Sequence, residues 1–345
     1  MTTTASRGIR IAVVGATGAV GRTVLRVLEE RGTPVTALGA FASRQYDEPL
    51  RFRDENVFVQ RASAEALRDY DVVLSAGGEN VSASLLPSCL ASGATVIDNS
   101  PAFRLHEGVP LVVPEINAGV IAAGQRLFPV ANCTAIILTM GVWPIVRAAG
   151  LRSARVASYQ AVSGAGTAGL DELRAAEAAL HDGTPEPMPR TFTAPIARNV
   201  IPQVGSLDDG ADSSEERKVV AETRKILGLP GLQVAVTAVR VPVATAHSEA
   251  VFLETERDTS VAELAEALAA APGVTYHPHG IVTPRDVEGT DDVHVARLRP
   301  EAESKRHFQA WIVGDQLRKG AATNAVQILE CLLARGAVRT ALQPA

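Results

Sequence analysis

The chain has 345 residues, of which 46% are hydrophobic and 21% are charged, so it is long enough for two domains with substantial cores. The formal net charge of −5 argues against nucleic acid or an anionic membrane as the main partner. Three widely separated cysteines lack the spacing of a zinc site or a redox motif, which favours a reducing cytoplasm and predicts no metal. We expect no signal peptide and no transmembrane segment, because the apolar stretches are short and interrupted.

The first 130 residues alternate between strand-like and helix-like patterns. Residues 9–14 (IRIAVV) are an apolar, β-branched run typical of a buried parallel strand, and a glycine-rich turn then leads into a helix that ends at Gly32. Further strands are predicted at 35–38, 71–75 and 95–97, and a helix within 82–93. This alternation predicts a doubly wound parallel sheet of the Rossmann type.

The turn after the first strand has the sequence GATGAVG, residues 15–21. Small residues allow a pyrophosphate to approach the backbone, and the helix that follows offers free N–H groups and the positive end of its dipole. The spacing is GxxGxxG rather than the commoner GxGxxG, and a tight turn without a ligand is the alternative. The predicted cofactor contacts of this turn are Gly15, Thr17, Gly18, Ala19 and Val20.

The end of the second strand indicates which nucleotide is preferred. An acidic residue there would bind the ribose 2′-hydroxyl of NAD, whereas this chain has Ser43 and Arg44 and no acid until Asp47. Ser43 and Arg44 suit a 2′-phosphate, so we predict NADP. A solvated surface arginine is the alternative interpretation of Arg44.

The second half has a different pattern, typical of an α+β domain. Residues 182–212 are rich in Pro, Asp and Gly and are predicted to be a long excursion, and the helix predicted over 321–335 could return to the first domain. The predicted domains are therefore 1–132 plus 325–345, which would bind dinucleotide, and 133–324, for catalysis and dimerisation. The strands are expected at 155–162, 232–242, 249–254 and 293–298, and the helices at 169–180, 213–227 and 261–270.

Cys133 differs from the other two cysteines. Cys89 and Cys331 lie within apolar helix patterns, where a thiol is usually a small buried hydrophobe. Cys133 and Thr134 come just before the apolar run AIILTMGVW, and at the N-terminus of a helix the dipole and free N–H groups would favour a thiolate. Spacing alone leaves a nucleophile and a packed cysteine equally open, and it does not single out His247 among the seven histidines as a partner.

A set of motifs gives the chain a family resemblance. They occur in one order over residues 9 to 332: GATGAVG, SAGGE, DNSPAFR, PLVVPEIN, NCT, YQAVSGAG, IPQVG, EERKVVAETRKIL, VRVPVATAHSE and DQLRKGAATNAVQI. Together they resemble the aspartate-β-semialdehyde dehydrogenases. The single motifs are shared with related acyl-phosphate reductases, whereas the complete set is specific.

The resemblance implies roles for individual residues. Cys133 would be the nucleophile, His247 the general acid/base, and Gln160 a residue that orients the substrate. Arg104 and Lys218 would bind phosphate, Arg240 the α-carboxylate and Glu215 the ammonium group, and these charges are complementary to β-aspartyl phosphate. Asn132 precedes the nucleophile as in the family. The resemblance extends the cofactor site to Ser75, Gly77, Ser163, Gly164, Gly166 and Asn324.

The implied activity is the reversible, NADP-dependent reductive dephosphorylation of β-aspartyl phosphate to aspartate-β-semialdehyde through a cysteine thioester, in lysine, methionine and threonine biosynthesis. The partners would be this substrate, inorganic phosphate and a second copy of the chain, as a homodimer or a dimer of dimers. Two alternatives are open. An enzyme like N-acetyl-γ-glutamyl-phosphate reductase would have no substrate ammonium for Glu215, and a non-catalytic nucleotide-binding paralogue would not need Cys133.

Overall fold

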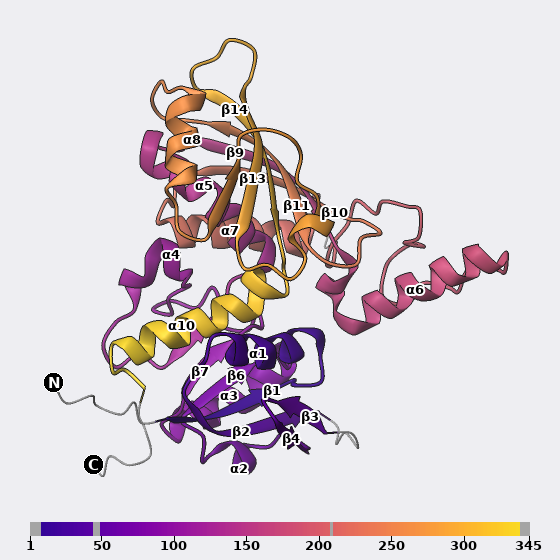
Figure 1. Cartoon of the computed structure of the whole chain (residues 1–345), viewed down its shortest axis with the longest axis vertical. Helices are drawn as coiled ribbons and strands as arrows, with labels where there is room; N and C mark the ends of the chain where they lie inside the picture. The colour runs from indigo at the N-terminus through magenta and orange to yellow at the C-terminus, as the bar shows by residue number, and fades with distance from the viewer. Residues whose placement is uncertain (1–7, 44–48, 208–209, 339–345) are drawn as a thin grey trace. The chain divides into compact units, whose positions relative to one another are not determined.

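The computed structural model describes residues 8–43, 49–207 and 210–338 (Figure 1). The chain forms two compact units, Met1–Ala131 with Ala321–Ala345, and Asn132–Gly320. The sequence-based boundaries placed Asn132 in the first domain and residues 321–324 in the second. Asn132 belongs to the second unit because it caps a helix there, and the C-terminal helix packs within the first.

The first unit is built on a six-stranded parallel sheet. Numbered along the chain, its strands lie in the order 3-2-1-4-5-6, which is that of the Rossmann fold. The predicted doubly wound sheet is therefore confirmed. Across the sheet the strands are β5 (Val59–Arg61), β2 (Val35–Ala42), β1 (Ile9–Val14), β6 (Val72–Ser75), β7 (Thr95–Asp98) and β8 (Leu127–Pro129).

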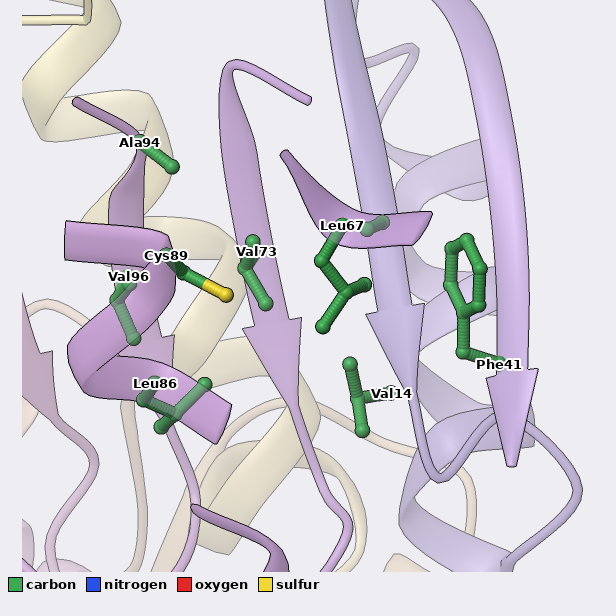
Figure 2. Close-up of a cluster of buried hydrophobic side chains, with 9 residues drawn as sticks. Val14, Phe41, Leu67, Val73, Leu86, Cys89, Ala94 and Val96 are labelled. Carbon is green, nitrogen blue, oxygen red and sulfur yellow. The ribbon is translucent and has the colours of Figure 1, made fainter. Parts of the chain in front are cut away.

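Buried apolar side chains hold this sheet to its helices. On one face Val14, Val73 and Val96 pack with Leu86 and Cys89 of α3 (Glu79–Ala91), as Figure 2 shows. Cys89 thus has the packing role predicted for it. The remaining elements of the unit are α1 (Ala19–Glu30), α2 (Ala64–Leu67), α4 (Pro114–Asn117), α10 (Thr323–Ala334) and the hairpin of β3 (Leu50–Phe52) and β4 (Glu55–Val57).

The second unit contains a six-stranded mixed sheet. Two of its strands, β12 and β14, were not predicted, and β11 begins at His247 rather than at Glu249. In spatial order the strands are β10 (Gln233–Arg240), β9 (Ser153–Gln160), β11 (His247–Glu254), β14 (His307–Gly314), β13 (Val293–Pro300) and β12 (Val274–His277). The helices α5 (Cys133–Ala149), α7 (Ser214–Leu227) and α8 (Val261–Ala269) pack on it.

Glycine allows α5 to lie close to the sheet. A Cβ atom on Gly141 would lie 2.5 Å from Cδ1 of Ile312, and one on Gly314 would lie 3.1 Å from Cγ1 of Ile137. Side chains at these positions would push helix and strand apart. Buried residues alternate along β9 and along β11 after its first three residues, so one face of the sheet lies beneath the helices.

The helix α6 (Gly166–Asp182) projects from the rest of its unit in Figure 1. Its residues Leu173 and Ala176 bury themselves against Ile196 and Ile201 of the following irregular segment. The predicted excursion over 182–212 therefore returns along α6 and forms a small apolar core with it. The 3-10 turn Val162–Ala165 joins β9 to this helix.

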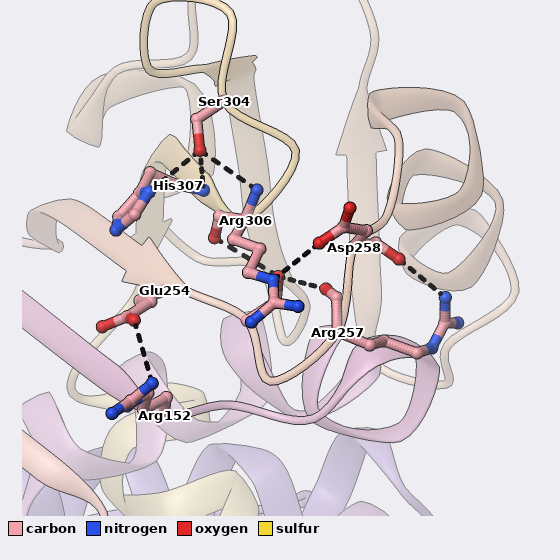
Figure 3. Close-up of polar contacts among 8 residues, drawn as sticks. Arg152, Glu254, Arg257, Asp258, Ser304, Arg306 and His307 are labelled. Atoms are coloured by element: carbon pink, nitrogen blue, oxygen red, sulfur yellow. Dashed lines mark hydrogen bonds and ion pairs between the residues drawn. The ribbon is translucent and has the colours of Figure 1, made fainter.

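The C-terminal end of β11, at Glu254, is polar (Figure 3). Arg306 donates to Asp258 at 2.6 Å, and Arg152 pairs with Glu254 at 3.8 Å. Such exposed pairs contribute little stability. Within the described ranges, no helix combines the length and apolar character needed to cross a bilayer.

Candidate active site

Cys133 is the first residue of α5, which confirms the predicted helix start. The helix begins here because Asn132 is a good N-cap: its Oδ1 accepts a hydrogen bond from the Ala135 backbone N–H at 3.2 Å. The Asn132 N–H donates to Glu222 Oε2 at 2.5 Å. A Cβ on Gly320 would lie only 2.9 Å from that of Cys133, so a glycine is needed beside the thiol.

Glu215 connects the helix cap to the sheet. Its Oε1 accepts hydrogen bonds from Asn132 Nδ2 at 2.9 Å and from Gln160 Nε2 at 3.2 Å. Glu215 lies in the first turn of α7, which is held by a capping box of Ser213 and Glu216. The structure thus brings together three residues predicted from separate motifs.

His247 is fully buried at the start of β11. Its Nδ1 accepts a hydrogen bond from the Ala161 backbone N–H at 3.1 Å, so the neutral ring carries its proton on Nε2. Burial, assisted by the nearby Arg240 cation, holds the pKa of His247 well below its usual value. The preceding residue, Ala246, has a φ of 69°, a backbone conformation that L-residues rarely adopt, and this conformation sets where the His247 ring lies.

Arg240 ends β10 beside the same backbone segment. Its Nη1 donates to the Ala161 carbonyl at 2.6 Å, and its guanidinium lies 5.7 Å from the centre of the Phe192 ring. Burial lowers the pKa of Arg240, and the negative charges of Cys133 and Glu215 oppose that shift. Ala161 therefore orients both the predicted acid/base and the predicted carboxylate ligand.

Gly164 lies against both of these side chains. A Cβ there would be 2.9 Å from Nη1 of Arg240 and 3.3 Å from Nε2 of His247. Ser163 beside it is buried and donates to the Ala244 carbonyl at 2.5 Å, and Gly166 begins α6 with φ of 75°. Lys218 is half-buried on α7, without a hydrogen bond to any described residue.

Several contacts of this site were missed from the sequence. Ala161 acts through its backbone, which no sequence pattern reveals, and Phe192 comes from the irregular excursion. Ser158, which accepts a hydrogen bond from Gln160, does carry a signal, because it lies two residues before Gln160 on the same face of β9.

The nucleotide loop lies in the first unit, at the carboxyl end of β1. Gly15 has φ of 77°, and a Cβ on it would lie 2.5 Å from the Ala76 carbonyl oxygen. The loop therefore meets the carboxyl end of β6 and the segment after it, where Ser75 and Gly77 were predicted to bind cofactor. β1 and β6 are the two central strands at which a Rossmann sheet reverses its order, the usual place for a dinucleotide.

The remaining residues of this loop lie at the start of α1. Thr17 precedes the helix, Gly18 is its N-cap, and Ala19 and Val20 form its first turn. The Gly18 N–H donates to the Gly15 carbonyl at 3.0 Å within the turn, and the start of a helix after such a turn is a common place for a pyrophosphate. Ser43 is exposed directly after β2, and Arg44 lies outside the described residues.

The other two predicted residues of the first unit are buried. Arg104 donates through Nη2 to the Asn99 carbonyl at 2.8 Å, and Asn324 donates through Nδ2 to the Val112 carbonyl at 2.9 Å. The segment that carries Arg104 begins at Asp98, which accepts hydrogen bonds from Ser82 and Ser100. These contacts fix the loop after β7.

A Rossmann unit and a mixed-sheet unit with a helix-start cysteine define a two-domain nucleotide-binding dehydrogenase. Two family models match: the semialdehyde dehydrogenase NAD-binding domain over residues 10–123, and the semialdehyde dehydrogenase dimerisation domain over residues 142–319. The chain is 39% identical over 338 residues to aspartate-semialdehyde dehydrogenase of Bacillus subtilis, covering 94% of this chain and 98% of the relative. It belongs to the aspartate-semialdehyde dehydrogenase family.

Solved structures agree with this assignment. Aspartate semialdehyde dehydrogenase II of Vibrio cholerae, complexed with ASA, has a TM-score of 0.92 and 38% identity, with 95% of this chain and 99% of that chain covered. The enzyme of Candida albicans with NADP has a TM-score of 0.73 at 22% identity, covering 96% and 100%. The second likeness supports the fold alone.

Proposed function

We propose that the protein catalyses the reversible, NADP-dependent reductive dephosphorylation of β-aspartyl phosphate to aspartate-β-semialdehyde. The observation that carries the proposal is Cys133 at the N-terminus of α5, with Arg240 electrostatically coupled to it and His247 held on the same short segment as Arg240. We further propose that the reaction serves lysine, methionine and threonine biosynthesis in the cytoplasm.

The residues of the first unit fit a dinucleotide. A Cβ on Gly15 would meet the Ala76 carbonyl oxygen at 2.5 Å and one on Gly77 would meet Val81 Cγ1 at 2.8 Å, so these glycines let the two loops pack closely. A tight glycine turn that leads from a strand into a helix suits a pyrophosphate. Ser43, after β2, would face the ribose end. When bound, the nicotinamide supplies the hydride that reduces the acyl group.

Cys133 begins the chemistry as a thiolate, which the helix dipole and the Arg240 cation favour. The sulfur attacks the acyl carbon, the carbon–oxygen bond to phosphate breaks, and a thioester forms on Cys133. After reduction the oxygen carries a negative charge, which then expels the Cys133 thiolate to release the aldehyde. The departing phosphate takes up the one proton that the overall reaction consumes.

His247 serves this sequence as a hydrogen-bond donor. Its Nε2–H is the proton-bearing group of the neutral ring, and no described residue occupies Nε2. The Nε2–H would stabilise the oxyanion, while the Ala161 N–H prevents Nδ1 from taking a proton. This refines the acid/base role that the resemblance implies.

The substrate ligands follow from charge. Glu215 would bind the ammonium group and Arg240 the α-carboxylate, because each already lies in the cluster around Cys133. Arg104 and Lys218 are proposed as phosphate ligands on the family resemblance. Replacing either should raise the KM for phosphate.

The proposal is tested by phosphate-dependent oxidation of aspartate-β-semialdehyde, followed as NADPH formation. The Cys133→Ala variant should lose turnover by at least about a thousandfold, because a water cannot replace the positioned nucleophile. Its NADPH affinity, measured by fluorescence titration, should stay within about twofold of wild type. Wild-type protein without turnover would refute the function, and an active Cys133→Ala variant would refute the nucleophile.

Cofactor preference is a separate prediction. Ser43 and Arg44 stand where an acid would select NAD, so kcat/KM should be at least about tenfold higher with NADP⁺ than with NAD⁺. The Ser43→Asp variant should reverse part of this difference by repelling the 2′-phosphate. Equal kcat/KM values for the two cofactors in wild type would contradict the prediction.

We also propose a homodimer formed through the second unit. The face of the mixed sheet opposite its helices carries exposed or half-buried residues, including Phe252, Arg155 and Tyr159. Phe252 is 42% exposed. A second copy of the chain would cover this face, in keeping with the description of the matched model as a dimerisation domain. A dimer of dimers is the larger assembly that the resemblance allows.

A further inference from the structure

Glu222 is a buried residue whose carboxyl group contacts the segment just before Cys133. It lies on α7, and its Oε2 accepts a hydrogen bond from the Asn132 backbone N–H at 2.5 Å. Asn132 is itself buried, and a buried backbone N–H that loses its acceptor is costly. The Glu222 carboxyl therefore helps to determine where the chain lies as it enters α5.

This contact completes a bonding pattern that a helix usually makes within its own first turn. In the capping box of α7, Ser213 Oγ accepts from the Glu216 N–H at 3.3 Å, and Glu216 Oε2 accepts from the Ser213 N–H at 2.6 Å. At α5 the first bond is present, from the Ala135 N–H to Asn132 Oδ1, but the methyl group of Ala135 cannot make the second. Glu222 supplies the missing carboxyl from a neighbouring helix.

Two carboxyl groups of α7 bind different groups of Asn132. Glu215 accepts from the side-chain Nδ2 at 2.9 Å, and Glu222 accepts from the backbone N–H. The two residues are seven positions apart, which is about two helical turns, so they lie on the same face of α7. The helix α7 packs against α5 (Figure 1), and this face meets the start of α5.

The two carboxyl groups differ in what a bound substrate would do to them. Under the proposed function Glu215 binds the substrate ammonium group, which would compete with Asn132 and Gln160 for its oxygen atoms. Glu222 is 1% exposed, compared with 9% for Glu215, and is therefore shielded from the substrate. Its bond to the backbone can persist through the reaction, when the Glu215 bond to Asn132 cannot be relied on.

We propose that Glu222 is a positioning residue, which completes the N-terminal cap of α5 from another helix and so holds Cys133 at the helix start during turnover. It acts through the peptide between Ala131 and Asn132, and it touches neither the substrate nor the thiol. Its effect is to keep the sulfur where the helix dipole favours a thiolate. The role in turnover rests on the proposed function, whereas the position of Cys133 in the free protein does not.

The kinetic test separates the length of the Glu222 side chain from its charge. Glu222→Gln keeps an acceptor oxygen at the same reach, whereas Glu222→Asp keeps the charge and withdraws the carboxyl by one methylene group. The Asp variant should lower kcat for aspartate-β-semialdehyde by about tenfold with KM within about twofold of wild type, and the Gln variant should keep kcat within about threefold. Glu215→Gln should instead raise KM, because it weakens the ligand of the ammonium group.

Thr223→Val is the matched control on the same helix. Thr223 is 1% exposed, and its hydroxyl has no hydrogen-bond partner among the described residues, so its removal should leave kcat unchanged. Glu222→Leu keeps the side-chain volume without an acceptor, and as a second variant it should lose kcat as Glu222→Asp does, in protein that circular dichroism shows to be folded. A Gln variant as slow as the Asp variant, or a folded Asp or Leu variant within about twofold of wild type, would overturn the proposal.

Alkylation reports the position of Cys133 without turnover. Labelling by iodoacetamide, followed by peptide mass spectrometry, should be about tenfold slower at Cys133 in Glu222→Asp than in wild type, and within about threefold in Glu222→Gln, because a displaced thiol loses the effect of the helix dipole. The half-buried Cys331 of α10, in the other unit, is the internal reference and should react equally in all three proteins. Equal rates at Cys133 would overturn the role of Glu222 even in an active enzyme. An inactive wild type with the expected labelling pattern would refute only the proposed function.

Discussion

At the scale of single residues, the site depends on which protonation state burial enforces. His247 and Glu249 lie two positions apart on one strand face, and burial lowers the pKa of the histidine and raises the pKa of the glutamate. The low-dielectric environment disfavours either charged form, and the Arg240 cation adds to the effect on His247. The hydrogen bond from the Ala161 backbone N–H to Nδ1 then decides which ring nitrogen carries the histidine proton.

The lowered pKa of His247 predicts a pH-dependent stability. As pH falls below about 6.5, the unfolded chain takes up a proton at this residue that the folded chain does not, so wild type loses stability. The loss should be about 1 kcal/mol greater in wild type than in His247→Gln between pH 7 and pH 5.5. Urea unfolding at the two pH values measures it. An identical pH dependence in the two proteins would show that folding does not lower the pKa of His247.

At the scale of elements, the start of α5 performs three tasks with one residue. Asn132 caps the helix, donates a hydrogen bond to Glu215 and, as a neutral amide, adds no charge next to the nucleophile. Its own backbone N–H is held by Glu222 of α7, so two helices fix the position of Cys133. The helix start is thus set locally by capping and globally by contacts from α7.

Asn132→Asp separates these tasks, because aspartate keeps the cap but places a second carboxylate beside Glu215. Alkylation of Cys133 by iodoacetamide, followed by peptide mass spectrometry, should slow by about tenfold, since a neighbouring negative charge disfavours the thiolate. Asn132→Ser, which keeps a neutral cap, is the control and should alkylate at nearly the wild-type rate. Equal rates for Asp and wild type would contradict the electrostatic argument.

At the scale of the whole molecule, assembly depends on the uncovered face of the mixed sheet. Phe252 lies on that face opposite Arg155 of β9, and its exposed ring would be buried by a second copy. The Phe252→Glu variant should weaken dimerisation by about a hundredfold in Kd, because a carboxylate would be desolvated there. Sedimentation velocity over a concentration series measures the shift.

A matched control tests whether added charge alone explains the result. Phe58→Glu changes an exposed phenylalanine of the first unit and should leave the mass in solution unchanged. A Phe252→Glu protein that remains fully dimeric would show that another surface joins the subunits.

Local patterns predicted much of the fold and part of the site. The β-branched runs of β1, β6 and β7, the glycine turn before α1 and the cap before Cys133 are all determined by neighbouring residues. The strands β12 and β14 were missed because their pairing partners stabilise them more than their own sequence does. For the same reason the start of β11 was predicted two residues late.

The sequence by itself determined the doubly wound parallel sheet and the helix start at Cys133, because these follow from periodicity and from local residue preferences, and its ordered motifs carried the family resemblance. Only the tertiary structure decided which atoms meet. The tautomer of His247 follows from a backbone N–H of another strand's end, and the isolation of Glu249 follows from the register of β9, β11 and β14. Sequence patterns specify the elements, whereas register and burial specify the protonation states on which the proposed chemistry depends.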